Sequence, residues 1–144
     1  MIRMFTPADE DAVIKIWLEA SKQAHDFVEP GFWEKQEADV RRDFLPQSEV
    51  WVYDDNLTGE VVAFTALRGN FVVALFVEPE RQGEGIGFQL MERIKKTHRE
   101  IELNVFKENK PSVAFYERQG FAPIGEGVDQ LTGHPEWHMR YKML

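Results

Sequence analysis

The chain has 144 residues, 43% hydrophobic and 12% aromatic, which predicts one domain over residues 1–144 and excludes a βα barrel, a two-domain dehydrogenase and a disordered chain. It has no cysteine, which excludes thiol catalysis, disulfides and thiolate metal sites, and no run approaches the ~18 apolar residues of a membrane span. The formal net charge of −8 disfavours nucleic acid or an anionic membrane as a partner.

The first third of the chain predicts a short strand and two helices. Residues 1–5 form the strand, and residues 6–9 (Thr-Pro-Ala-Asp) have the capping hydroxyl, the first-turn proline and the capping-box acid of a helix start. Apolar residues then recur at helical spacing, at Val13, Ile16, Trp17, Ala20 and Ala24. A second helical stretch over residues 31–44 stops before Pro46.

Three strands follow at short spacing, over residues 50–53, 60–67 and 71–77, and their short turns make them antiparallel neighbours. The third is apolar throughout, so we expect it at the centre of the sheet with both faces covered.

The second half alternates helices and strands. Glycines 83, 85 and 87 lead into a helix that ends near His98, and a strand over residues 101–106 precedes a helix over residues 112–119. Two strands, over residues 121–126 and 136–142, complete the chain. This order predicts an α/β fold with a mixed, mostly antiparallel sheet of about seven strands, flanked on both faces by about four helices.

Charge is unevenly distributed along the chain. Residues 81–110 hold seven basic and five acidic side chains, whereas the remaining residues hold 10 basic and 20 acidic ones. A locally basic segment in an acidic chain suits one anionic ligand there and a cationic partner elsewhere. A plain solvated helix face is the alternative interpretation.

Residues 82–87, Gln-Gly-Glu-Gly-Ile-Gly, join a buried strand to a helix start. The first N–H groups of a helix have no internal partner, and glycines let the backbone approach a phosphate closely. The spacing is neither that of a Rossmann fingerprint nor that of a Walker A loop, and the preceding antiparallel strands deny the βαβ context. A phosphate-bearing ligand is therefore expected, with a turn that binds nothing as the alternative.

Two motifs carry a resemblance to a known family. Residues 82–87 match the Q/R-x-x-G-x-G/A pyrophosphate motif of the GNAT N-acetyltransferase superfamily, and residues 109–121 resemble its N-x-x-A-x-x-x-Y-x-x-x-G-F segment, with Ser112 in place of the usual Ala. The element order resembles that family over the whole chain, and small bacterial N-acetyltransferases, including protein-lysine-acetylating ones, are the most similar members.

The resemblance implies acetyl-CoA as cosubstrate, without a metal, and assigns residues to it. The strand backbone would bind the pantetheine arm, the loop amides and Phe88 the pyrophosphate, and Asn109 the coenzyme. The implied residues are Leu75, Phe76, Val77, Gln82, Gly83, Glu84, Gly85, Ile86, Gly87, Phe88 and Asn109. The negative charge of Glu84 would disfavour an anionic ligand unless its side chain points outward.

Acyl transfer from a thioester to an amine needs a base, because deprotonating an alkyl amine at neutral pH costs roughly 4–5 kcal/mol, and the leaving thiolate benefits from an acid. The resemblance places Tyr116 as that acid, against an alternative in which its ring packs beside Phe115 and its hydroxyl bonds to the backbone. Several related enzymes have a Glu twelve residues before the tyrosine, where this chain has Asn104. Glu102, His25 and bulk water stay open as the base, and we expect His25 to assist deprotonation.

Other signals are weaker. His134 and His138 are four residues apart but lie in a loop and a strand, so no zinc site is expected. Aromatic residues that could line a pocket for a cationic acceptor, with core packing expected for at least two of them, are Trp33, Phe27, Trp137 and Tyr141.

The sequence therefore predicts an N-acetyltransferase that transfers directly in a ternary complex to a primary amine. Residues 1–60 carry 14 acidic and 6 basic side chains, which favours a cationic acceptor: a protein lysine or N-terminus, a polyamine or an aminoglycoside-like compound. A non-catalytic acyl-CoA sensor is the main alternative, and a dinucleotide-binding fragment is a third.

The expected compartment and assembly follow from absences. Residues 1–7 lack an apolar h-region and a small-residue cleavage site, so no signal peptide is expected, and the lack of cysteine fits a reducing compartment. We expect a cytoplasmic protein, monomeric or homodimeric, that binds neither nucleic acid nor membrane.

Overall fold

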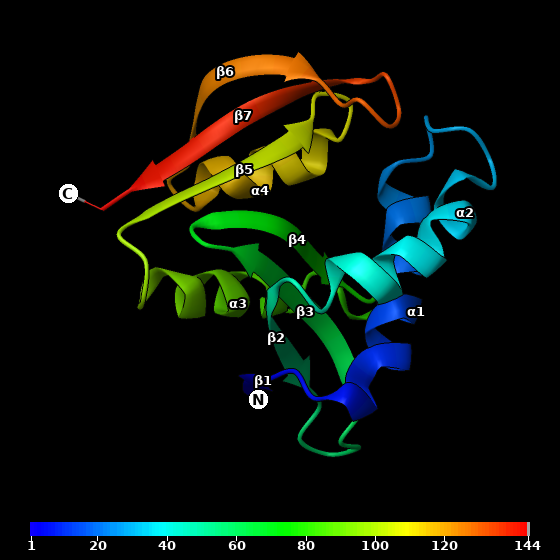
Figure 1. Ribbon diagram of the computed structural model, residues 1–144. Helices are drawn as coiled ribbons and strands as arrows, with labels where there is room; N and C mark the ends of the chain where they lie inside the picture. Colours follow the sequence, from blue (N-terminus) through cyan, green and yellow to red (C-terminus); the bar gives the residue numbers. More distant parts are fainter. Residues whose placement is uncertain (144) are drawn as a thin grey trace.

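The computed structural model describes residues 1–143 as a seven-stranded sheet with helices on both faces (Figure 1). The strands are β1 (Ile2–Met4), β2 (Glu49–Asp54), β3 (Val61–Arg68), β4 (Phe71–Val77), β5 (Glu100–Phe106), β6 (Ala122–Val128) and β7 (Pro135–Lys142). The helices are α1 (Glu10–Ala24), α2 (Phe32–Asp39), α3 (Ile86–Lys95) and α4 (Lys110–Arg118), with short 3₁₀ helices at Pro7–Asp9 and Pro79–Arg81 and a π-helical turn at Val40–Phe44. No helix of this part of the chain is both long and apolar enough to cross a bilayer.

The strand order is β1-β2-β3-β4-β5-β7-β6, and every neighbouring pair is antiparallel except β4 and β5. The predicted mixed, mostly antiparallel α/β sheet is thus confirmed. The parallel pair arises because α3 separates β4 from β5 and returns the chain to the same end of the sheet.

The start of α1 is fixed by the predicted capping box and an arginine. Thr6 and Asp9 bond reciprocally, with the Thr6 N–H donating to Asp9 Oδ2 at 2.8 Å. Arg3 on β1 donates to both oxygens of Asp9, at 2.8 and 2.9 Å, and to Asp54 on β2 at 2.8 Å. The Arg3 guanidinium holds the pKa of the Asp9 carboxyl below its usual range. This network fixes where α1 starts relative to the sheet.

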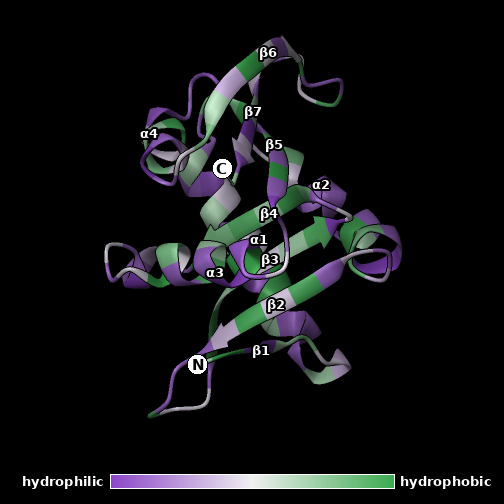
Figure 2. Ribbon diagram, turned by 90° about the vertical axis from the view of Figure 1, so that its left-hand side faces the viewer, coloured by the Kyte–Doolittle hydropathy of each residue, from purple (hydrophilic) through white to green (hydrophobic). Residues whose placement is uncertain are grey.

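Two layers of helix enclose the sheet. On one face, the buried stripe of α1 packs with Val52, Phe64 and Ala74, and α2 packs against the same cluster. On the other face, Ile86 and Leu90 of α3 pack on β3, while α4 lies beside α3 over β5 and β7. Figure 2 shows the most continuous hydrophobic colouring on the central strands, between these layers.

β4 is central and covered on both faces, as predicted, because Phe76 packs on the α1 side while Leu75 and Val77 pack on the α3 side, but its edge toward β5 is open in its second half. β4 pairs with β5 only through Phe71 with Glu102 and Val72 with Leu103, after which the two strands diverge (Figure 1). Residues 75–77 are therefore only half-buried. The apolar run thus lines an opening in the sheet rather than a closed core.

Candidate active site

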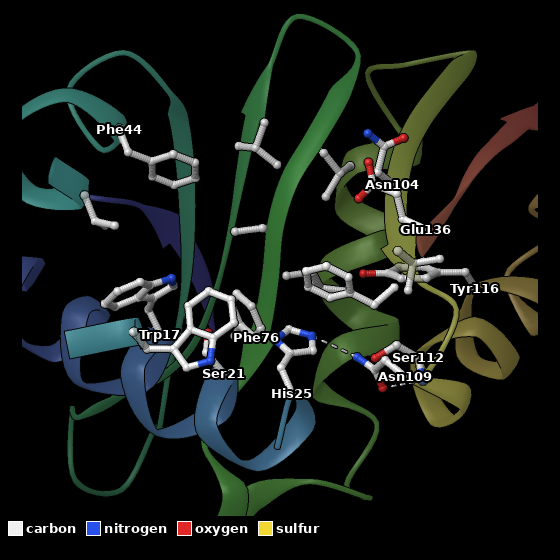
Figure 3. A pocket seen from close by; sticks show the side chains of 18 residues that line it. Trp17, Ser21, His25, Phe44, Phe76, Asn104, Asn109, Ser112, Tyr116 and Glu136 are labelled. Atoms are coloured by element: carbon white, nitrogen blue, oxygen red, sulfur yellow. Dashed lines mark hydrogen bonds between the residues drawn. The ribbon is translucent and has the colours of Figure 1, made fainter. Parts of the chain in front are cut away.

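Two pockets meet at the divergence of β4 and β5. A loop pocket of about 810 Å³ lies beside the glycine segment and α4. An aromatic pocket of about 220 Å³ lies between α1, α2 and the sheet (Figure 3). The residues common to both are Leu75, Phe76, Asn109, Ser112 and Tyr116. Two molecules that enter from the two pockets would therefore meet at these side chains.

The glycine segment exposes a row of main-chain donors. Within residues 1–143, the N–H groups of residues 83–88 have no acceptor, whereas the Gln82 N–H is directed at the Pro79 carbonyl at 3.5 Å. Gly83 and Gly85 have φ values of +82° and +81°, a region that side chains with a Cβ rarely adopt. The three N–H groups at the start of α3 add the positive end of its dipole. This segment is built to bind an anion through main-chain donors.

The structure brings all the residues expected to bind coenzyme into the loop pocket except Glu84. Both oxygens of the Glu84 carboxylate accept from Nε of Arg81 at 3.1 Å, and Arg81 also donates to Asp55 at 2.7 Å. Glu84 therefore does not line the pocket, and its negative charge is paired with Arg81.

The basic surplus of residues 81–110 is mostly not at the loop pocket. Of its basic side chains, only Arg81 lines the pocket within residues 1–143. Arg93, Lys95 and Lys107 lie over aromatic rings, at 4.3, 4.5 and 4.1 Å from the ring centroids. Arg118, outside the segment, also lines the pocket. The expectation that this local charge marks the anion site is therefore only partly correct. The main-chain amides, not the basic side chains, are the principal anion-binding groups of the loop pocket.

The open edge of β4 offers further backbone groups. The Glu78 N–H donates to the Val62 carbonyl on β3 at 2.8 Å. Because antiparallel bonding alternates from residue to residue, the backbone groups of Leu75 and Val77 face the gap toward β5. The Gln82 side chain reaches the Val77 carbonyl at 3.1 Å and Gln23 on α1 at 2.9 Å. The backbone of Leu75 thus remains available to a ligand.

Tyr116 projects from α4 between the two pockets, and its hydroxyl points into the shared space (Figure 3). Its ring packs edge-on against Phe115 and Phe121, but its hydroxyl has no hydrogen-bond partner within residues 1–143. The alternative in which this hydroxyl only bonds to the backbone is therefore not what the structure shows. Burial raises the pKa of Tyr116, so the phenol keeps its proton.

Asn109 fixes the orientation of His25. The Asn109 Oδ1 accepts from the Ser112 N–H at 3.4 Å as the cap of α4, which directs Nδ2 toward His25 Nε2 at 3.2 Å (Figure 3). Since an amide nitrogen only donates, Nε2 is the accepting nitrogen and Nδ1 carries the proton. Nδ1 is buried with no partner within the described residues.

An aromatic enclosure keeps His25 neutral. Its ring lies 4.9 Å from that of Phe106, 5.4 Å from Trp33 and 5.9 Å from Phe27, measured between centroids. Burial among these rings lowers the pKa of His25 to about 4. The imidazole is therefore uncharged at neutral pH.

The four aromatic residues expected near the acceptor divide between two locations. Trp33 lines the aromatic pocket, and Phe27 contacts His25 at its edge. Trp137 and Tyr141 pack in the cluster under α4, on the opposite face of the sheet. Core packing is thus confirmed for two of the four.

The far wall of the aromatic pocket is formed by Asn104 on β5 and Glu136 on β7, which lie side by side in Figure 3. Glu102, one of the three open choices for the base, lines neither pocket, and its carboxylate bonds to His138 at 2.6 Å. Glu136 was not among the residues expected at the site. Only the pairing of β7 with β5 brings it there, so a pattern within one segment could not have indicated it.

No metal-binding arrangement occurs at either pocket in the described part of the chain. His138 pairs with Glu102, while His134 lies 3.5 Å from Glu108. The acidic groups close enough together to share an ion belong to Glu19, Glu78 and Glu80, which line neither pocket.

Comparisons with known proteins agree with this geometry. A family model described as an acetyltransferase (GNAT) domain matches residues 46–123. The peptidyl-lysine N-acetyltransferase YiaC of Escherichia coli is 29% identical over 100% of this chain and 98% of its own. The peptidyl-lysine N-acetyltransferase YjaB of Escherichia coli is 32% identical over 93% of this chain and 90% of its own.

Solved structures share the fold. The solution structure of apo YjaB superposes with a TM-score of 0.87 at 29% identity, covering 100% of this chain and 98% of that one. The PaiA N-acetyltransferase of Thermoplasma acidophilum, solved with coenzyme A, has a TM-score of 0.81 at 19% identity, with 99% and 98% of the two chains covered.

Proposed function

Because the chain belongs to the GNAT family of N-acetyltransferases, we propose that it transfers the acetyl group of acetyl-CoA to the side-chain amine of a peptidyl lysine. The observation that carries this proposal is the junction of the two pockets at Leu75, Phe76 and Tyr116. Donor and acceptor entering from opposite sides meet there, as direct transfer in a ternary complex requires. The chain has no cysteine to carry the acetyl group in between.

The residues of the loop pocket fit acetyl-CoA. The free amides of residues 83–88 suit the pyrophosphate, since they supply several donors at a helix start without a Cβ in the way. The open backbone edge at Leu75 suits the amide groups of the pantetheine arm. The N–H group of Leu75, which faces this gap, can donate to the oxyanion that develops on the thioester carbonyl.

Tyr116 has the properties of the acid that protonates the leaving thiolate. Its hydroxyl is free to donate, lies where the pockets meet, and keeps its proton because burial raises its pKa. His25 was expected to assist deprotonation of the amine. Its low pKa and the Asn109 donor on Nε2 favour a different role, in which the neutral ring accepts a hydrogen bond from Asn109 and closes the aromatic wall.

The choice of a peptidyl lysine rests on two observations. YiaC and YjaB are both named peptidyl-lysine N-acetyltransferases, and each is similar to most of this chain. The aromatic pocket also combines apolar rings with one carboxylate, which suits an aliphatic ammonium. We further propose that the protein is cytoplasmic, which suits a chain without cysteine. We also propose that it has no resident metal and that it is a monomer or a homodimer.

The test is an assay of free thiol released from acetyl-CoA in the presence of separate acceptors. A lysine-containing peptide should give faster release than a polyamine, an aminoglycoside, or a peptide whose only amine is acetylated. Release that is faster with the polyamine or aminoglycoside would reject the peptidyl acceptor. Tight acetyl-CoA binding by calorimetry with no release from any amine would instead support the sensor alternative, which the family membership and the free Tyr116 hydroxyl do not favour.

A further inference from the structure

The aromatic pocket has a single charged side chain. Among its lining residues in the described part of the chain, all are apolar or neutral at pH 7 except Glu136. Glu136 lies near the start of β7, directly opposite Phe106 on β5, and Asn104 is two residues before Phe106, on the same face of the sheet. Figure 3 shows its carboxylate beside the Asn104 amide, on the wall that faces Trp17 and Phe44.

A carboxylate in this position has no partner within the protein. No hydrogen bond or ion pair joins the Glu136 side chain to any residue among 1–143, although it is only partly exposed. Other acids of the same strand pair and its loop are engaged: Glu102 with His138, and Asp129 with Thr132. A carboxylate without a protein partner, on the wall of a mostly apolar pocket, is free to bind a cationic group that enters the pocket.

The acceptor amine has the matching requirement. An alkyl amine with a pKa near 10.4 arrives at neutral pH as an ammonium ion, and aromatic walls alone do not replace the water that it loses. It must also lose a proton before it can attack the thioester. The groups that line the pocket offer few alternatives: Asn104 cannot take a proton, Tyr116 holds its own, and His25 Nε2 is engaged by Asn109.

We propose that Glu136 binds the ammonium group of the acceptor lysine and accepts its proton, a role that the neutral amide of Asn104 cannot fill. This inference rests on the proposed function and deepens it, since it identifies the acceptor as a protonated alkyl amine. Asn104 then acts beside Glu136 as a neutral hydrogen-bonding group, and the rings of Trp17 and Phe44 contact the aliphatic part of the lysine.

The proposed transfer conserves every atom and charge. One N–H proton passes from the ammonium to the Glu136 carboxylate, directly or through one water. The freed nitrogen forms a bond to the thioester carbonyl carbon and the C–S bond breaks. The thiolate takes the Tyr116 proton, the second proton of the new N–C linkage returns to the Tyr116 oxygen, and protonated Glu136 releases its proton to solvent.

The charged surroundings of Glu136 suit a proton acceptor. Burial and the negative charge of Asp129 in the loop before β7 raise its pKa above the ordinary value, and His138 on the same strand opposes them. On β5 the neighbouring side chains are Phe106 and Asn104, and on β6 the paired residue is Gly127, so neither adjacent strand places a charge directly beside it. A raised pKa makes a carboxylate a better base while it stays ionised at neutral pH.

The pH dependence of kcat/KM for a lysine peptide tests the proposal. The wild-type enzyme should be active on the ammonium form and show a plateau between the pKa of Glu136 and that of the amine, near 10.4. Glu136→Gln should lose the plateau, so that its kcat/KM rises about tenfold per pH unit toward the pKa of the amine. At pH 7.5 we expect its kcat/KM to be at least tenfold below that of the wild type. A plateau of equal height in Glu136→Gln would overturn the proposal.

A second acceptor separates this role from a structural one. Hydroxylamine is neutral at pH 7.5, so Glu136→Gln should acetylate it at a rate within about twofold of the wild type. Equal losses for hydroxylamine and lysine would contradict a role in ammonium binding. Glu136→Asp, which keeps the carboxylate, should restore the plateau in part even if the glutamine variant is less stable.

Two controls complete the experiment. Glu126→Gln removes an exposed carboxylate of the neighbouring strand and should leave both acceptors unaffected. Acetyl-CoA affinity, measured by calorimetry, should be the same in all variants. If the wild type released no thiol with either amine, the proposed function itself would fail, which is distinct from a wild type that is active and a Glu136→Gln that matches it.

Discussion

Asn109 and His25, 84 positions apart in the chain, are joined by a hydrogen bond of 3.2 Å from the amide Nδ2 to the imidazole Nε2. The other end of the same amide caps α4 through the Ser112 N–H. One side chain therefore links the end of α1 to the start of the helix that carries Tyr116. The helix cap also decides which histidine nitrogen is protonated.

This relationship predicts different outcomes for two substitutions at Asn109. Asn109→Ala removes the cap and the donor, and should lower the free energy of unfolding by about 1–2 kcal/mol. Asn109→Asp keeps an oxygen cap for α4 but places an acceptor opposite His25 Nε2, so the pKa of His25 should rise. Thermal unfolding and an NMR titration of His25 measure the two effects. Asn56→Ala, in an exposed turn, is the control, and an unchanged His25 titration in Asn109→Asp would contradict the assigned tautomer.

The lowered pKa of His25 predicts a loss of stability in mild acid. The unfolded chain takes up a proton near pH 6.5, whereas the folded chain does so only near pH 4. Stability is therefore fully present above pH 6.5 and falls as the pH drops to 4, by about 3 kcal/mol. His25→Gln should lose less stability over this interval in urea unfolding. His98→Gln is the comparison, and parallel curves for wild type and His25→Gln would show that the histidine is not responsible.

The two left-handed glycines of the loop predict a specific effect on coenzyme binding. Gly85→Ala introduces a Cβ at a φ of +81°, which costs about 1–2 kcal/mol and reorients the adjacent amides. We expect the Kd for acetyl-CoA to rise about tenfold or more. Gly59→Ala is the matched control, since Gly59 has a φ of +75° in a turn that lines neither pocket.

Both variants should lose similar stability in thermal unfolding, because both create the same backbone strain with open space around the new methyl group. Only Gly85→Ala should weaken coenzyme binding in calorimetry. Equal coenzyme affinity in the two variants would mean that the amides of the loop do not hold the pyrophosphate.

Removal of the Tyr116 hydroxyl should separate chemistry from binding. Tyr116→Phe should lower kcat about 100-fold while leaving the Kd for acetyl-CoA unchanged, because the hydroxyl acts on the leaving thiolate. The melting temperature should not fall, since the hydroxyl has no hydrogen-bond partner in residues 1–143. Burial raises the pKa of Tyr116, so its ionisation should not limit kcat at any pH below about 10.

The control for this variant is Tyr141→Phe, whose ring packs under α4 away from both pockets. Its kcat should match that of the wild type. A Tyr116→Phe enzyme with wild-type kcat would assign the proton to water or to another group.

The sequence by itself determined most of the fold, since the features that decide it are local. The capping box at residues 6–9, the apolar spacing of α1 and the left-handed glycines before α3 each act within a few residues. Helix period and turn chemistry depend on near neighbours alone, which is why the elements and their order follow from the chain. The divergence of β4 from β5 was not predictable in the same way, because an apolar run in a closed core and one that lines an opening look alike.

The acceptor side of the site was decided only by tertiary structure. The register of β7 on β5 places Glu136 on the pocket wall and pairs Glu102 with His138 instead. Likewise, only the approach of the end of α1 to the start of α4 shows that His25 is desolvated, neutral and hydrogen-bonded to Asn109. A side chain's pKa and hydrogen-bond partners depend on desolvation and on groups distant in sequence, and no local pattern records them.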